Sequence, residues 1–222
     1  MSSFHVCHQS ALTWLKQLGQ VSVGLAAFSL TQQSQVRAHI KAHNLGSAHN
    51  AWLQITPQQE LGALFNQLYR VLKVDRDCFI RVTEQQLGLI QVLGQAAGFR
   101  LGPLRLGQQL GANNTFIPLY LLHFRKGRAP AQWRQQQWLE ASQPNHRNLP
   151  EAIMLPLLKQ CCPGDELVID PILCDASLGL CALTHGWRFA GATQEEQRFN
   201  QIKRTLNGVD GATELMPQNA QI

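Results

Sequence analysis

The stretch that decides the fold is VIDPILCDASLGLCALTHGWRFAGAT, residues 168–193. It begins with an apolar run that ends at Asp170 and continues through a short loop. A helical pattern over 177–185 and a second apolar run over 187–192 follow the loop. A buried strand, a helix and another buried strand in this order are typical of a parallel α/β sheet. Ligands of such sheets bind at the carboxyl ends of the strands, so the loop after Asp170 is the first candidate site.

The same alternation of patterns continues along the rest of the chain. Apolar runs predict strands over 4–7, 21–28, 77–83, 115–124, 165–170 and 187–192. Helical patterns lie between the first two strands, over 58–72, 84–98, 177–185 and 195–207, and after Pro150. We therefore expect one α/β domain with a central, mostly parallel sheet that carries helices on both faces.

The composition is that of a globular protein, with 222 residues, of which 45% are hydrophobic and 15% charged. A net charge of +5 favours an anionic partner such as nucleic acid. The six cysteines lack CxxC spacing, and the sequence shows neither a signal-peptide pattern nor an apolar stretch of membrane-spanning length. These features predict a cytoplasmic protein with reduced thiols and no membrane association. His39 and His43 are four residues apart, but no third ligand is near them in sequence, so no metal site is expected.

Three long stretches resemble one family of enzymes in order and spacing. Residues 144–206 match, without a gap from Gly164 through Leu206, the C-terminal half of DNA amino-methyltransferases, which modify adenine N6 or cytosine N4. Residues 4–30 resemble the segment of that family that ends in the catalytic tetrapeptide, and 60–82 resemble its E--RVLKPGG-L-I pattern. The order agrees with the permuted members of the family, in which the catalytic segment comes first.

The resemblance implies a Rossmann-like S-adenosylmethionine-dependent methyltransferase fold over the whole chain. It divides the single domain 1–222 into a catalytic half, 1–124, a short basic insert, 125–149, and a cofactor half, 150–207. Residues 208–222 are expected to form a frayed tail.

The cofactor loop departs from the family pattern. The family reads Gly-Ser-Gly where this chain has Cys174, Asp175 and Ala176, although backbone must approach the cofactor closely at these positions. The acid that binds the ribose hydroxyls in the family is replaced by Thr193, while Asp170 is retained. We therefore expect that the chain has no cofactor and does not bind S-adenosylmethionine.

The catalytic tetrapeptide departs as well. Where the family has DPPY or a close variant, this chain has Ser29, Leu30, Thr31 and Gln32. The family uses the first side chain and a proline carbonyl to bind the target amine, and the aromatic residue to stack on the flipped base. Both prolines and the aromatic residue are absent, so no catalytic residue is predicted and a pseudoenzyme is the favoured interpretation.

Three functions stay open for such a scaffold. The favoured one is DNA binding by the basic insert and its flanks, through Arg125, Lys126, Arg128, Trp133, Arg134 and Arg147. The second is a regulatory role through a protein partner or a homodimer. The alternative is an active N6-adenine or N4-cytosine methyltransferase with a divergent cofactor loop, in which Asp175 or Glu195 would replace the missing ribose ligand.

Overall fold

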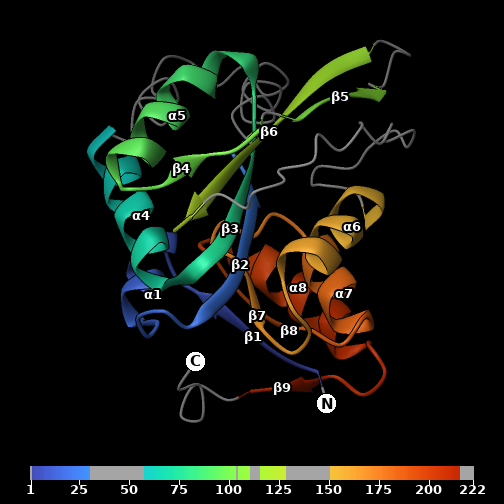
Figure 1. The fold of residues 1–222 in the computed structure, drawn as a ribbon. Helices are drawn as coiled ribbons and strands as arrows, with labels where there is room; N and C mark the ends of the chain where they lie inside the picture. Colours follow the sequence, from blue (N-terminus) through green and yellow to red (C-terminus); the bar gives the residue numbers. More distant parts are fainter. Residues whose placement is uncertain (1, 31–57, 104, 111–115, 129–150, 216–222) are drawn as a thin grey trace, which may run out of the picture.

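A computed structural model describes residues 2–30, 58–103, 105–110, 116–128 and 151–215. The described strands are β1 (Ser3–His8), β2 (Val23–Ser29), β3 (Leu72–Val82), β4 (Arg100–Leu101), β5 (Arg105–Leu110), β6 (Phe116–Lys126), β7 (Leu167–Asp170), β8 (Arg188–Thr193) and β9 (Thr213–Glu214). They form one sheet in the order β4-β6-β3-β2-β7-β8-β1-β9, and β5 pairs with β6. β6 is antiparallel to its three partners and the other pairs are parallel, so the predicted mostly parallel sheet is confirmed (Figure 1).

Helices cover both faces of this sheet, as predicted. The first layer holds α1 (Ala11–Gln17), α4 (Gln58–Val71) and α5 (Leu87–Ala96), which follows the short 3-10 helix η1 (Glu84–Gln86). The second layer holds α6 (Glu151–Cys161), α7 (Ser177–Thr184) and α8 (Glu196–Asn207). The two layers lie on opposite sides of the central strands in Figure 1. Each layer has its own cluster of buried apolar side chains against the sheet.

Continuous apolar sequence explains why β2 and β7 lie at the centre of the sheet. Every residue of both strands is buried, which is expected of parallel strands with helices on both faces. Among the helices, α4 buries Leu64, Phe65 and Leu68 along one side. Each such side chain contributes about 1.5–3 kcal/mol by leaving water.

Some boundaries differ from the sequence-based prediction. β3 begins at Leu72 rather than 77, because its first residues are mostly polar and exposed and therefore lack an apolar strand pattern. Asp75 interrupts this part of the strand with a backbone φ of 59°. The predicted helix 84–98 is divided between η1 and α5, and the strands β4 and β5 were not predicted.

The expectation of a frayed tail is wrong for the part of it that the structure describes. Thr213 and Glu214 form the edge strand β9, parallel to β1. The amide of Leu215 donates to the carbonyl of Phe4 at 2.8 Å, and the Lys203 ammonium lies 2.6 Å from the Glu214 carboxylate. Backbone pairing and an ion pair hold this segment in place. Neither produces a periodic hydrophobic pattern that could be recognised in so short a sequence. Residues 216–222 lie outside the described residues.

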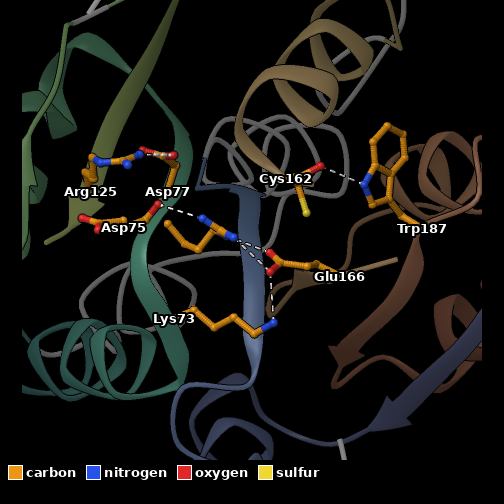
Figure 2. A network of polar contacts seen from close by, with 8 residues as sticks. Lys73, Asp75, Asp77, Arg125, Cys162, Glu166 and Trp187 are labelled. Atoms are coloured by element: carbon orange, nitrogen blue, oxygen red, sulfur yellow. Dashed lines mark hydrogen bonds and ion pairs between the residues drawn. The ribbon is translucent and has the colours of Figure 1, made fainter. Parts of the chain in front are cut away.

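A polar network joins the amino-terminal part of β3 to the loop before β7 (Figure 2). The Glu166 carboxylate accepts from Arg76 Nε at 2.7 Å and from Lys73 Nζ at 3.0 Å. The hydrogen bond from Arg76 holds the pKa of Glu166 below its ordinary value. The Trp187 indole donates to the carbonyl of Cys162 at 3.1 Å in the same view. This network is at the edge opposite the predicted site, so it supports the fold and not the chemistry.

No helix within the described ranges combines the length and the apolar character that crossing a bilayer requires.

Candidate functional site

Four neighbouring strands carry a buried polar residue at or next to their last position, at the carboxyl edge of the sheet. On the face covered by α6, α7 and α8, these residues are Arg81 of β3, Ser29 of β2, Asp170 of β7 and Thr193 of β8. Their exposed fractions are 8%, 1%, 2% and 6%. Ser29 is in register with Arg81, and Asp170 is in register with Gly191, two residues before Thr193. Buried polar groups are costly, so their concentration at the edge where α/β folds bind ligands marks the candidate site.

Asp170 is the acid among these four residues, and its pKa is strongly shifted. Burial raises its pKa to about 8, although the carboxylate Oδ1 accepts a hydrogen bond from the amide of Ile172 at 2.9 Å. The negative charge of Asp175 adds to the rise in pKa. The Asp170 side chain therefore ends β7 and shapes the following turn.

Replacement of Asp170 by asparagine is expected to reduce the pH dependence of stability. The folded-state pKa of about 8 lies above the ordinary value of about 3.9, so between these values the folded chain retains a proton that the unfolded chain has lost. This contribution is complete below about pH 4 and is lost as the pH rises to 8, by at most about 1.4 kcal/mol per pH unit. Urea unfolding of the wild type and Asp170→Asn at pH 5 and pH 8 measures the difference. Asp210→Asn, at an exposed position, is the control, and equal pH slopes in all three proteins would refute the expectation.

The loop between β7 and α7 is closed by its own side chains. The Asp175 carboxylate accepts from the amide of Ser177 at 2.8 Å, so it occupies a donor at the start of α7. The Cys174 thiol donates to the carbonyl of Ile172 at 3.1 Å, and the methyl of Ala176 is buried in the apolar cluster beneath α7. The three residues predicted to obstruct the loop thus lie together at the carboxyl edge.

Arg81 is the member of the site that the sequence analysis missed. It lies within the buried strand β3, and burial lowers the pKa of its guanidinium. The negative charge of Asp175 acts in the opposite direction on this pKa, so the guanidinium lies within electrostatic range of the loop. An arginine inside the apolar run DCFIRV was the available signal. Its position across from Ser29 connects the predicted catalytic segment with the predicted cofactor loop.

The predicted catalytic segment is only partly described. Ser29 is buried at the end of β2, and the amide of Leu30 donates to the carbonyl of Arg81 at 2.8 Å. The carbonyl of Leu30 accepts from the side-chain amide of Gln86 at 3.1 Å. Thr31 and Gln32 lie outside the described residues. The backbone leaving β2 is therefore fixed against β3 and η1.

Thr193 stands at the end of β8, where the family is expected to have the acid that binds ribose. Thr193 Oγ1 accepts from the amide of Glu195 at a long 3.4 Å, and the Glu195 carboxylate pairs with Arg198 at 2.9 Å. Glu195 is the cap residue of α8 and therefore belongs to the helix start rather than to the end of β8.

Two of the predicted DNA-contacting cations have intramolecular partners. The buried Lys126 ammonium donates to the carbonyls of Tyr69 and Leu72, each at 2.6 Å, at the end of α4. Arg125 donates to the buried Asp77 carboxylate at 2.6 Å, and Figure 2 shows these two side chains facing one another. Both cations therefore stabilise the fold, and we remove them from the predicted set of DNA contacts. The sequence could not reveal this, because their partners are about fifty residues away in the chain.

For the other residues predicted to contact DNA, that role stays a prediction. Arg128 is exposed, and its backbone amide donates to the Asp75 carboxylate at 2.9 Å. Trp133, Arg134 and Arg147 lie outside the described residues.

The strand order, the two helical layers and the site at the carboxyl edge define the fold of S-adenosylmethionine-dependent methyltransferases. Solved structures that this chain resembles include DNA methylases. TTHA0409 from Thermus thermophilus, provisionally assigned as a DNA modification methylase and solved with S-adenosyl-L-methionine, has a TM-score of 0.69 at 18% identity, over 98% of this chain and 99% of its own. M1.HpyAVI with its SAM ligand gives 0.61 at 14% identity, over 92% and 99% of the chains. The cytosine-N4-specific PvuII DNA methyltransferase gives 0.62 at 11% identity, over 96% of each.

These likenesses, which cover 92% to 98% of the chain, confirm the predicted fold. No family model matches the sequence, and no curated protein matches it at a significant level.

Proposed function

We propose that this chain is a methyltransferase-fold protein that has lost methyl transfer and acts by binding DNA. The observation that carries the proposal is the closed carboxyl edge. There, the Asp175 carboxylate occupies the Ser177 amide at the start of α7, and the buried guanidinium of Arg81 lies close to the same loop. A helix start whose amide is already taken is not available to a ligand.

The residues of this edge do not fit S-adenosylmethionine. The sulfonium and ammonium of that molecule are both cationic, so the fixed positive charge of Arg81 at the site opposes them. Thr193 supplies no carboxylate for the ribose hydroxyls. The two acids that could replace the ribose ligand are engaged elsewhere, Asp175 with Ser177 and Glu195 with Arg198. The active-enzyme alternative therefore has weaker support.

DNA is the favoured ligand for two reasons. Proteins of this fold whose structures are solved include DNA methylases, and the chain carries a net charge of +5. Of the cations predicted to contact DNA, Arg128 is exposed near the start of the basic insert, and Arg134 and Arg147 follow in the sequence. Phosphate contacts of this kind position a protein on DNA without reading its sequence.

The test combines two titrations of the pure protein. Millimolar S-adenosylmethionine is expected to leave the melting temperature unchanged, since a ligand stabilises only the state that binds it. A labelled duplex is expected to bind at low salt, with an affinity that falls as salt rises, and Arg128→Ala and Arg134→Ala are each expected to reduce the salt slope by about one. Arg188→Ala is the matched control, because Arg188 is exposed at the amino end of β8.

The outcomes separate the three functions. A saturable thermal shift with S-adenosylmethionine would favour the active enzyme over the pseudoenzyme. Absence of DNA binding at low salt would remove the DNA-binding proposal and leave a protein partner or a homodimer as the ligand to pursue.

A further inference from the structure

Three side chains of metal-binding type meet where α6 begins and α7 ends. Glu151 is the first residue of α6, and Cys181 and His185 are four residues apart at the end of α7, on one side of the helix. A carboxylate oxygen, a thiol sulfur and a ring nitrogen of these residues all lie within 4.8 Å of one another. Within the described parts of the chain, no other group of three or more His, Cys, Asp or Glu residues has this arrangement.

The surroundings suit a metal ion that enters from solvent. Cys181 is buried, whereas Glu151 and His185 are exposed, so the sulfur would bind from the protein side and the other two ligands from the surface. The His185 ring lies with Nδ1 3.0 Å from the carbonyl oxygen of Cys181. A neutral ring that donates from Nδ1 has its lone pair on Nε2, and such a backbone contact commonly fixes the orientation of a ligating histidine.

We propose that Glu151, Cys181 and His185 bind one Zn²⁺ ion, with water as the fourth ligand. Sulfur, imidazole nitrogen and carboxylate oxygen together favour zinc over magnesium or calcium, which prefer sets of oxygen ligands. Ligand atoms on a tetrahedral zinc are about 3.5 Å apart, given metal–ligand bonds of about 2.0–2.3 Å. The present separations reach 4.8 Å, and rotation of the exposed Glu151 side chain can shorten its distances to the other two ligand atoms.

Zinc at this place would join the start of α6 to the end of α7. The two helices already pack against each other, and α6 begins directly after the basic insert 125–149. The ion would thus fix the point from which the insert leaves the domain. The proposed zinc site is independent of the closed carboxyl edge and of the proposed loss of methyl transfer.

The experiment uses the full chain, reduced and freed of metal by a chelator. Competition with a chromophoric chelator is expected to show one Zn²⁺ per chain, and Co²⁺ in place of zinc is expected to give the charge-transfer absorption of a thiolate ligand. His185→Gln and Cys181→Ala are each expected to weaken zinc binding by at least about 10–100-fold, the range seen when metal-site groups are removed. Glu151→Gln is expected to have a smaller effect in the same direction.

Cys161→Ser and His8→Gln provide matched controls, since both positions lie outside the cluster and carry the same ligand types. They are expected to bind zinc like the wild type. His185→Gln and Glu151→Gln change exposed side chains, so they report on the site even if Cys181→Ala does not fold. Absence of stoichiometric zinc binding by the wild type, or binding that His185→Gln leaves unchanged, would overturn the proposal and leave His185 as a cap for the last turn of α7.

Discussion

Asp77→Ala is expected to destabilise the protein by about 3–5 kcal/mol, because it removes the common partner of two basic side chains inside the fold. The buried Asp77 carboxylate accepts from His123 Nε2 at 2.7 Å and from Arg125 Nη1 at 2.6 Å. The His123 ring also stacks on Phe79, with ring centroids 4.5 Å apart, so it has little freedom to find another partner. The alanine variant leaves the Arg125 guanidinium largely buried without its counterion.

Thermal and urea unfolding measure this loss of stability. For a chain of this length, each kcal/mol lowers the melting temperature by about 2–4 °C, so a decrease of roughly 10 °C is expected. Asp77→Asn keeps an oxygen acceptor for His123 and is expected to lose less, and Asp210→Ala, at an exposed acid, is expected to lose almost nothing. A loss below about 1 kcal/mol for Asp77→Ala would mean that Arg125 is free to contact DNA, as the sequence alone suggested.

The sequence predicted the fold because its information is local. Strands such as β2 and β7 are continuous apolar runs, and the helices show one apolar side, so each element can be recognised without its neighbours. The position of the site followed from the same pattern, since strand ends in a parallel sheet meet at one edge. The order of the elements therefore predicted that Asp170, Cys174 and Thr193 lie at this edge.

The roles of individual cations could not be predicted in the same way. Lys126 and Arg128 are two residues apart in one basic stretch, yet the first is buried against the end of α4 and the second is exposed. Arg81 was overlooked because its importance comes from pairing with Ser29 and from the loop before α7, about ninety residues later in the chain. The cluster of Glu151, Cys181 and His185 likewise depends on how α6 packs on α7.

Restoring the family residues of the cofactor loop is expected to create S-adenosylmethionine binding. The variant is Cys174→Gly, Asp175→Ser, Ala176→Gly and Thr193→Glu. The two glycines remove Cβ atoms from the loop, the serine releases the carboxylate that now accepts from the Ser177 amide, and the glutamate offers oxygens to the ribose hydroxyls. If the dissociation constant of the variant is about 10 µM, 1 mM ligand stabilises it by about 2.7 kcal/mol, which is a rise of roughly 5–10 °C in melting temperature.

Arg81 decides how complete this recovery is. Its guanidinium stays at the site in the quadruple variant, and it opposes a cationic ligand, so adding Arg81→Met is expected to strengthen binding further. The wild type with Arg81→Met alone is the matched control and is expected not to bind, since the loop remains closed by Asp175. Each comparison is made as the ligand-dependent shift within one variant, which separates binding from any change in basal stability.

Neither restored variant is expected to methylate DNA, because residues 29–32 still lack the prolines and the aromatic residue of the family tetrapeptide. Methyl transfer by either variant would show that the catalytic segment lies elsewhere in the chain, and failure of both to bind would show that the closed loop is not what excludes the cofactor.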